Sequence, residues 1–435
     1  MPDPYIFFMS ERVEITSLAF GGKGVGRIGG KVVFVPYSAP GDVAQVEVVS
    51  QKKGYSEGVI ERIEVPSTAR VEPLCPLYGE CGGCNLQHMG YKDQLHWKQR
   101  ILEETIRRIG KAEGIIFEEP IASPMEFNYR ARARFQAEGG RAGFFGARSH
   151  SVVDMEGCPL LDPIVNETFS DIRKFLKGPK RPRVGSFEVG LSEGDMKTVA
   201  VFHVDGDDHF NWAGLLEGVR HLKGIEVWAS PEKGRHGRFV SSAGDTGISY
   251  SIEGIEIRAR ASVFSQVNRL QNRNMVGKAI EFAAPTGAEL VVDLFSGVGN
   301  LTLPFARRSR EVAGIEQSHV AVRQARENAA KNSIKNVYFH ASDSASWLKQ
   351  NLKSLEKEME SVLVLDPPRG GEPQIAKSLS GARPAKILYI SCSPPTLARD
   401  ISALAGCGYR VSRAVLIDMF PQTYHIESVI GLELA

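Results

Sequence analysis

Apolar and polar residues alternate along residues 11–64, as they do in short β-strands that bury one face. Glycine-rich breaks separate four apolar pairs: Val13 and Ile15, Val32 and Phe34, Val46 and Val48, and Val59 and Ile63. Strands of this length and spacing predict a small β-barrel. Basic residues lie in or beside the turns, at Lys23, Arg27, Lys31, Lys52 and Lys53. Their placement favours a barrel of the oligonucleotide-binding (OB) type over a purely structural one.

From about residue 268 onward the pattern changes to alternating helices and strands. The expected helices are 270–284, 301–308 and 319–332, and the expected strands are 289–295, 312–316, 337–340, 361–366 and 386–391. Two further strand-like runs, 411–418 and 427–434, follow as a closing antiparallel pair. Such a series predicts a doubly wound, Rossmann-like sheet.

The middle of the chain mixes both kinds of element. Prolines 66, 73 and 76 mark a linker, and residues 163–176 have a helical pattern. An amphipathic helix is expected over 94–111, with Leu95, Ile101, Leu102, Ile106 and Ile109 opposite Lys98, Arg100, Arg107 and Arg108. With 435 residues the chain exceeds one ordinary core. We predict a multidomain α/β protein, with a barrel at 9–64, a central α+β domain at 65–265 and the doubly wound sheet at 266–435.

The formal net charge is only +2, so a polyanionic partner must be held by local basic patches. Two segments qualify, 128–150 with a net charge of 5 − 1 = +4 and 171–183 with 6 − 1 = +5. Either is as compatible with a solvated face as with nucleic-acid contact. No run approaches the ~18 apolar residues of a membrane span, and the N-terminus lacks the basic lead of a secretory signal. We therefore expect a cytoplasmic protein.

Cysteines cluster in a pattern that indicates metal binding. Three of the six are separated by five and then two residues, with a glycine pair in the loop: Cys75, Cys81 and Cys84. Cys158 is the candidate fourth ligand. Four thiolates suit either zinc or a [4Fe-4S] cluster, and their spacing does not decide between the two. A fourth thiolate closes the centre, which favours a structural role over radical chemistry. Cys407 has no such neighbours and is assigned to the core.

Residues 291–300 form an apolar strand that ends in a glycine turn and opens a helix, the pattern of a nucleotide-type cofactor site. Glu316 ends the next strand, where a carboxylate can accept both ribose hydroxyls. Asp343 ends the third strand, near an adenine edge, and Asp366 ends the fourth. A dinucleotide site would place a third glycine at position 302, which is Thr302. The shorter acidic form favours S-adenosylmethionine over a nicotinamide cofactor.

Cys392 directly follows the apolar run 385–390, at a strand end where a thiol can meet a substrate. A methyltransferase with a thiol there indicates covalent catalysis at C5 of a pyrimidine, a carbon that is a poor nucleophile until a thiolate adds to C6. Removal of the C5 proton requires a separate base, for which Glu427 is the candidate and His425 the competitor. Arg369 stands where an exocyclic-amine methyltransferase would carry an aromatic residue, which disfavours that chemistry.

These motifs together resemble the iron-sulfur RNA 5-methyluridine (uracil-C5) methyltransferases, of the 23S rRNA or tRNA type. The resemblance covers nearly the whole chain and is carried by residues 264–268, 366–369, 391–392 and 425–427 besides the barrel and the cysteines. It implies a class I S-adenosylmethionine-dependent methyltransferase domain, a TRAM-type barrel and a [4Fe-4S] cluster on Cys75, Cys81, Cys84 and Cys158.

The same resemblance assigns roles in the active site. Cys392 would be the nucleophile, Glu427 the base, and Phe264 a neighbour of the flipped base. Six residues would line the cofactor pocket: Gln266, Phe295, Asn300, Glu316, Asp343 and Asp366. Ser393 departs from the family, which more often has an acid or an amide there, and this affects the fine positioning of the substrate.

The substrate is expected to be RNA, in ribosomal or transfer RNA, with the target uridine in a loop or an unfolded stem that lets the base leave its stack. Uracil is favoured over cytosine, since the related cytosine enzymes carry a second cysteine near the fourth strand and residues 362–371 contain none. The generic basic patches specify neither the RNA nor the uridine. We expect a monomer without an obligate protein partner. An RNA-binding or chaperone module with a vestigial methyltransferase domain is the alternative function.

Overall fold

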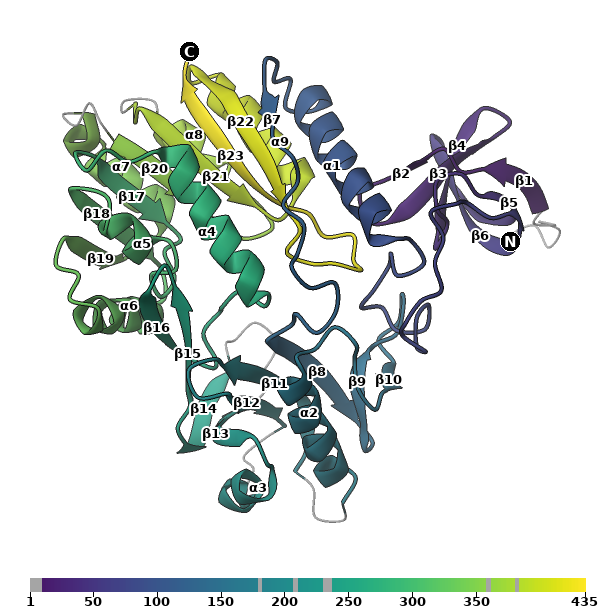
Figure 1. Cartoon of the computed structure of the whole chain (residues 1–435), viewed down its shortest axis with the longest axis horizontal. Coiled ribbons are helices and arrows are strands. Elements are labelled where there is room, and N and C mark those ends of the chain that lie inside the picture. Colours follow the sequence, from purple (N-terminus) through teal and green to yellow (C-terminus); the bar gives the residue numbers. More distant parts are fainter. Residues whose placement is uncertain (1–9, 179–181, 206–209, 230–236, 357–360, 380–382) are drawn as a thin grey trace, which may run out of the picture.

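The computed structural model describes residues 10–178, 182–205, 210–229, 237–356, 361–379 and 383–435. Three parts are visible in Figure 1: a barrel at one end, a large sheet flanked by helices at the other, and a central sheet between and below them. This arrangement confirms the predicted multidomain α/β architecture. The predicted domain boundaries themselves stay a prediction.

The N-terminal barrel is one six-stranded sheet in the order β1-β5-β6-β4-β3-β2. Its strands are β1 (Ser10–Glu14), β2 (Ser17–Leu18), β3 (Lys23–Ile28), β4 (Lys31–Pro36), β5 (Val43–Gln51) and β6 (Tyr55–Val65). Small aliphatic side chains such as Val13 and Val46 fill its core. The predicted phase of β4 is wrong, because Val33 and Val35 face the core while Val32 and Phe34 lie on the outer side. All four residues are apolar, so the period alone could not choose the face.

The central part is a seven-stranded sheet in the order β10-β9-β8-β11-β12-β13-β14. Its elements are β8 (Arg132–Glu138), β9 (Arg141–Phe145), β10 (Val152–Asp154), α2 (Pro163–Leu176), β11 (Val184–Ser192), β12 (Lys197–Val204), α3 (Trp212–Gly218), β13 (Leu222–Ala229) and β14 (Arg238–Gly244). Helices α2 and α3 contribute to its core, where Phe135 stacks on Phe169 with ring centroids 4.2 Å apart. Such a pair adds about 0.5–1.5 kcal/mol beyond burial.

The C-terminal part is an eight-stranded sheet in the order β19-β18-β17-β20-β21-β23-β22-β7. Its strands are β17 (Leu290–Leu294), β18 (Glu311–Glu316), β19 (Val337–Ala341), β20 (Ser361–Leu365), β21 (Lys386–Ser391), β22 (Tyr409–Ile417) and β23 (Glu427–Leu434). The first five are parallel, and β23 is antiparallel to both β21 and β22. This order confirms the predicted doubly wound sheet with its closing antiparallel pair.

Helices cover both faces of this sheet. One core contains side chains of α4 (Arg269–Ala283), α5 (Thr302–Ala306) and α6 (His319–Lys331), together with the hairpin of β15 (Gly247–Ile252) and β16 (Ile255–Arg260). The other contains side chains of α1 (Tyr91–Arg108), α7 (Ser344–Glu356), α8 (Gln374–Ser378) and α9 (Pro394–Ala405). Helix α1 and edge strand β7 (Ile116–Phe117), which pairs with β22, therefore belong to this sheet although they precede the central part in sequence (Figure 1).

Lys98 of helix α1 and Ile109 at its end differ from the predicted amphipathic pattern. Lys98 was expected on the polar face, but its side chain is only 1% exposed and ion-pairs with the equally buried Asp418. Ile109, expected on the apolar face, is 54% exposed at the end of the helix. The placement of Lys98 was wrong because its partner lies 320 residues away in the sequence.

The two predicted basic segments are largely paired within the protein. Arg132 forms a half-buried ion pair with Glu188 at 2.7 Å, and Arg173 pairs with Asp154 at 2.8 Å. Lys180 and Arg181 lie outside the described residues. Counting charges along the sequence therefore overstated the positive charge that these segments can present to a polyanion. In the part of the chain that the structure covers, no helix is both long and apolar enough to cross a membrane.

Candidate active site

The predicted site residues gather along one edge of the C-terminal sheet. Phe295, Glu316 and Asp366 stand at or directly after the carboxyl ends of the parallel strands β17, β18 and β20, and Cys392 follows β21. Glu427 begins β23, which runs antiparallel, and the pairing of Ser391 with Ser428 brings it to the same edge. Ligands bind at this edge in open α/β sheets. The topology thus brings together side chains that are up to 132 residues apart.

The glycine turn after β17 has the geometry of a ligand cradle. Phe295, Gly297 and Gly299 all have left-handed backbones, with φ of 72°, 55° and 97°. A Cβ added to Gly297 would meet nothing within 4 Å, so this part of the turn borders open space. Glu316 accepts hydrogen bonds from the backbone N–H groups of Gly297 at 3.1 Å and Ser318 at 2.7 Å. These bonds fix its carboxylate beside the open space, where oxygen lone pairs remain for ribose hydroxyls.

A buried carboxyl lies beneath this turn. Asp293 is 1% exposed, accepts a 2.5 Å hydrogen bond from the Thr302 hydroxyl, and its Oδ1 atom has no partner among the described residues. Burial raises its pKa to about 7, opposed by the Thr302 bond and reinforced by Asp366 and Glu316. Burial also raises the pKa of Asp366 to about 7. A buried oxygen without a protein partner is expected at a site where a polar ligand is that oxygen's partner.

Three other predicted cofactor residues have different surroundings. Asn300 exchanges two hydrogen bonds with Asn272 of α4, at 2.9 and 3.0 Å. Asp343 is exposed at the end of β19, and its carboxylate accepts the N–H of Ser346 at the start of α7. Gln266 is half-buried in the segment between β16 and α4. Phe264 in that segment is 74% exposed, so its aromatic ring is open to solvent.

The candidate nucleophile, Cys392, is a half-buried free thiol between β21 and α9. Burial, reinforced by the nearby Glu427 and Asp366 carboxyls and opposed by Arg369, raises its pKa to about 11. A thiol in this state is mostly protonated at neutral pH. Its reactivity therefore depends on how far its surroundings shift it toward the thiolate.

Glu427 and His425 differ sharply as candidate bases. Glu427 is buried, and burial together with the Asp366 carboxyl raises its pKa well above its usual value, with Arg369 opposing. His425 packs against Tyr424 and Phe420, and burial together with nearby positive charges lowers its pKa to about 4. A carboxylate with a raised pKa is the stronger proton acceptor, since its product, the neutral acid, suits the buried site. The electrostatics thus favour Glu427.

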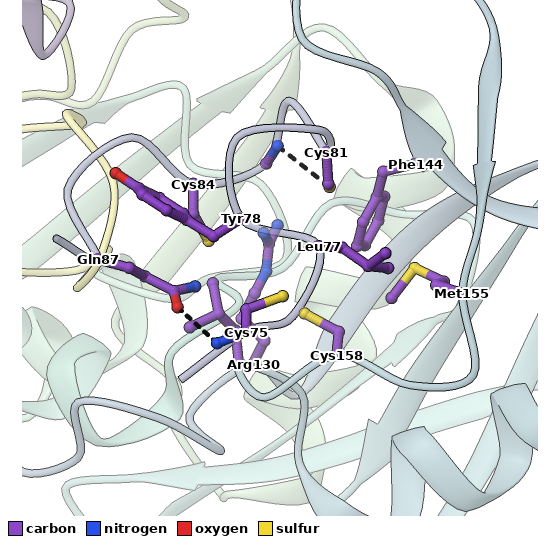
Figure 2. Close-up of a pocket in the computed structure, with 12 residues that line it drawn as sticks. Cys75, Leu77, Tyr78, Cys81, Cys84, Gln87, Arg130, Phe144, Met155 and Cys158 are labelled. Atoms are coloured by element: carbon purple, nitrogen blue, oxygen red, sulfur yellow. Dashed lines mark hydrogen bonds between the residues drawn. The ribbon is translucent and has the colours of Figure 1, made fainter. Parts of the chain in front are cut away.

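All four cysteines predicted as metal ligands line one small cavity of about 30 Å³. Apolar side chains and Arg130 complete the lining. In Figure 2 the Cys75 and Cys158 sulfurs approach each other from opposite sides of the cavity. Burial raises the pKa of Cys84 to about 12 and of Cys158 to about 11. Thiols this resistant to ionisation need a cation to hold them as thiolates.

The thiols are not gathered tightly. Among the described residues, no three Cys, His, Asp or Glu side chains are placed to hold a single metal ion. Cys81 instead accepts a hydrogen bond from the Gly83 N–H at 3.4 Å. The four cysteines therefore share one cavity without their side chains converging on a single point.

Comparison with known proteins decides the family. The model of the tRNA (uracil-5-)-methyltransferase family matches residues 90–434, and the TRAM domain model matches residues 10–60. The chain belongs to the tRNA (uracil-5-)-methyltransferase family. It is an S-adenosylmethionine-dependent RNA uracil-C5 methyltransferase with an N-terminal TRAM barrel, as the sequence predicted.

Individual relatives of this uracil methyltransferase span nearly the whole chain. An uncharacterized RNA methyltransferase of Aquifex aeolicus is 34% identical, covering 97% of this chain and 98% of the relative. The 23S rRNA (uracil(1939)-C(5))-methyltransferase RlmD of Shewanella frigidimarina is also 34% identical, covering 97% and 95%. The structure of Pyrococcus abyssi tRNA (uracil-54, C5)-methyltransferase with S-adenosyl-L-homocysteine shares the fold, with a TM-score of 0.78, 24% identity and coverage of 97% and 100%.

Sequence reasoning missed two side chains of this methyltransferase that contact the segment leading into Glu427. Gln94 and Lys98 of α1 bind this connection. One available signal was the spacing of Gln94 and Lys98 by four residues, on the helical face that also carries the buried Leu102. Two long polar side chains in line with a buried residue indicate a polar contact inside the protein.

Proposed function

We propose that this enzyme forms 5-methyluridine by covalent catalysis, with Cys392 as the nucleophile and Glu427 as the base. The observation that carries the proposal is the common strand edge of Cys392, Asp366 and Glu427, where a thiol and a carboxyl of raised pKa influence each other. S-adenosylmethionine supplies an electrophilic methyl group on a positively charged sulfur.

The Cys392 thiol gives its proton to solvent, its sulfur bonds to C6 of uracil, and the C5=C6 electron pair moves to C5 and O4. The electron-rich C5 then takes the methyl group of S-adenosylmethionine. The S–CH3 bond breaks with its electron pair left on the sulfur, S-adenosylhomocysteine is the leaving group, and C5 carries both a methyl group and a hydrogen. The Glu427 carboxylate removes that proton, the electron pair restores the C5=C6 bond, and the Cys392 thiolate leaves. Glu427 returns its proton to solvent before the next turnover.

We assign the cofactor pocket to the six predicted residues. Glu316 is the ribose ligand, supported by the two backbone N–H groups that hold its carboxylate. Phe295 and Asn300 flank the glycine turn, and Asp366 directly follows the neighbouring strand β20. Gln266 and Asp343 are assigned from the family resemblance. The open space at Gly297 supports this placement.

The proposed RNA is 23S ribosomal RNA. Several relatives at 33–34% identity are 23S rRNA (uracil(1939)-C(5))-methyltransferases, whereas the tRNA enzyme of Pyrococcus abyssi is 24% identical. We expect 5-methyluridine to disappear from one position of 23S rRNA in a strain that lacks this protein, and to return with the wild-type gene but not with a Cys392→Ala gene. Sequencing-based mapping of both RNAs checks this, and loss confined to transfer RNA would contradict the ribosomal assignment.

We further propose that Cys75, Cys81, Cys84 and Cys158 hold a [4Fe-4S] cluster. A tetrahedral zinc ion at about 2.3 Å from each sulfur draws the four sulfurs to about 3.8 Å from one another. A cluster binds each thiolate at a different iron and keeps them further apart. That all four thiols line one cavity supports a shared centre, and the resemblance to the iron-sulfur RNA 5-methyluridine methyltransferases favours the cluster over zinc. Arg130 would offset its negative charge.

Anaerobically purified protein is expected to contain iron and sulfide in equal amounts and little zinc. Cys158→Ser should remove most of the iron and its visible absorbance, because three thiolates leave one iron without a protein ligand. Cys407→Ser is the matched control and should keep both, since Cys407 donates to the Ala376 carbonyl on another part of the chain. Elemental analysis and absorption spectra measure this, and stoichiometric zinc would refute the cluster.

The proposal includes a cytoplasmic monomer that needs no partner subunit for its chemistry. A vestigial RNA-binding or chaperone module is disfavoured, because both carboxyls and the thiol are present and share one edge.

A further inference from the structure

The segment between β22 and β23, residues 418–426, is the part of the protein that delivers Glu427 to the active-site edge. It also carries His425 and Tyr424. Most of the groups that hold this segment come from the first 130 residues of the chain rather than from the flanking strands. We call it the catalytic connection.

Lys98 of α1 anchors the start of the catalytic connection. Its Nζ donates to Asp418 Oδ1 at 2.7 Å and to the Phe420 carbonyl at 3.0 Å. The two charged side chains are 1% and 0% exposed. A buried ion pair is weak evidence for stability, because desolvating both charges offsets much of their attraction. The geometry of this pair, by contrast, is fixed, because neither buried charge is exposed to water as an alternative partner.

Gln94, one turn before Lys98, anchors the middle of the same segment. Its Nε2 donates to Gln422 Oε1 at 2.9 Å, and its Oε1 accepts the Gln422 N–H at 3.0 Å. The same amide donates to the carbonyls of Leu86 and Met89. Gln422 has a left-handed backbone with φ of 69°, a conformation that its surroundings must maintain.

The loop that follows Cys84 and the central part add further bonds. The N–H groups of Asn85 and Leu86 donate to the Gln422 carbonyl at 3.2 and 3.1 Å, and the Tyr129 hydroxyl donates to the Pro421 carbonyl at 3.0 Å. The segment is thus fixed at successive residues from 418 to 422, and it leads directly into the strand that begins with Glu427.

We propose that Gln94 and Lys98 are positioning residues, which hold the catalytic connection so that the Glu427 carboxylate meets the proton on C5. This inference rests on the proposed role of Glu427. The structure records no hydrogen bond from Gln94 or Lys98 to Cys392 within the described residues. Their loss should therefore slow proton removal and leave the formation of the Cys392 adduct intact.

Two variants test the inference in the full-length protein. Gln94→Leu removes the amide bonds at nearly constant volume. Lys98→Met alone would leave a buried, unpaired Asp418 carboxylate, so the second variant combines K98M with D418N. Gln99→Leu is the matched control, because Gln99 lies on the same helix and its side chain bonds to Glu103, with no bond to the catalytic connection among the described residues. Each protein is assayed with S-adenosylmethionine on RNA that carries either uridine or 5-fluorouridine at the target.

Adduct formation on 5-fluorouridine RNA needs Cys392 and the methyl group but not the base, since fluorine cannot leave as a proton does. We expect both variants to form this adduct within about twofold of the wild-type rate and to lose about 100-fold in turnover on uridine RNA, as for a catalytic group displaced by about 1 Å. A methylated covalent intermediate should accumulate. Gln99→Leu should match the wild type in both assays.

Two results would overturn the inference. Equal losses of adduct formation and turnover, including losses through unfolding, would mean a purely structural role. Unchanged turnover in either folded variant would mean that these side chains do not position the base. Failure of the proposed function is distinguishable, because Glu427→Gln itself would then release product without a methylated intermediate.

Discussion

Replacing Cys392 with alanine is expected to abolish both turnover on uridine RNA and covalent capture of 5-fluorouridine RNA. Without the sulfur, C6 receives no electron pair and C5 remains too electron-poor to take up a methyl group. Removing a nucleophile lowers kcat by about 10⁴-fold or more. Transfer of labelled methyl groups to RNA, together with a denaturing gel for the protein–RNA adduct, measures both effects.

Cys407→Ala is the control for this experiment, since that thiol follows the opposite end of α9 and donates to a backbone carbonyl. It should leave turnover and capture unchanged. An adduct that persists in Cys392→Ala would refute the assignment of the nucleophile. In the wild type, capture should accelerate by up to about tenfold per pH unit above neutrality, because the thiolate fraction of a thiol with a pKa of about 11 rises until that pH.

Glu427→Gln is expected to stop the reaction after methyl transfer rather than before it. Glutamine nearly preserves the shape of the side chain but cannot accept the C5 proton, so the methylated uracil stays bonded to Cys392. Loss of a general base lowers turnover by about 10²- to 10⁴-fold. Mass spectrometry of the protein after brief mixing with uridine RNA should detect the methylated adduct, which wild-type enzyme does not accumulate.

Glu433→Gln is its matched control, because Glu433 lies on the same strand but its side chain is 44% exposed and 3.6 Å from Arg410. Its turnover should equal that of the wild type. Rapid product release by Glu427→Gln would exclude this role and turn attention to His425. That histidine is less suited to the task, because burial lowers its pKa to about 4.

The sequence alone predicted those parts of the fold in which the local pattern of apolar and polar residues matches which side chains are buried in the structure. Alternation in the barrel and helix-strand alternation after residue 268 predicted both sheets, because each pattern has one face to bury. Glu316, Asp366 and Cys392 could be placed at one edge because the carboxyl ends of parallel strands always meet there. Glu427 joined them only through the antiparallel pairing of β23, which the sequence suggested as a closing pair.

The failures share a different physical cause, which is dependence on distant partners. Lys98 looks like a surface residue until Asp418 is seen beside it, and Arg132 looks available to RNA until Glu188 accepts it. In β4, Val32, Val33, Phe34 and Val35 are all apolar, so the barrel rather than the strand chose which face to bury. In the same way, cysteine spacing predicted four candidate ligands, which line one cavity, but not how closely their sulfurs approach.

The C-terminal sheet combines segments from the beginning and the end of the chain, which has a consequence for how the enzyme folds during synthesis. Helix α1 and strand β7 emerge early, yet their partners β22 and the Asp418 carboxylate are translated more than 290 residues later. Until the last strands leave the exit tunnel, the Lys98 ammonium has no counter-ion and the apolar side of α1 has no sheet to cover. A nascent chain is therefore inactive until synthesis is almost complete, and it is exposed to chaperones throughout that interval.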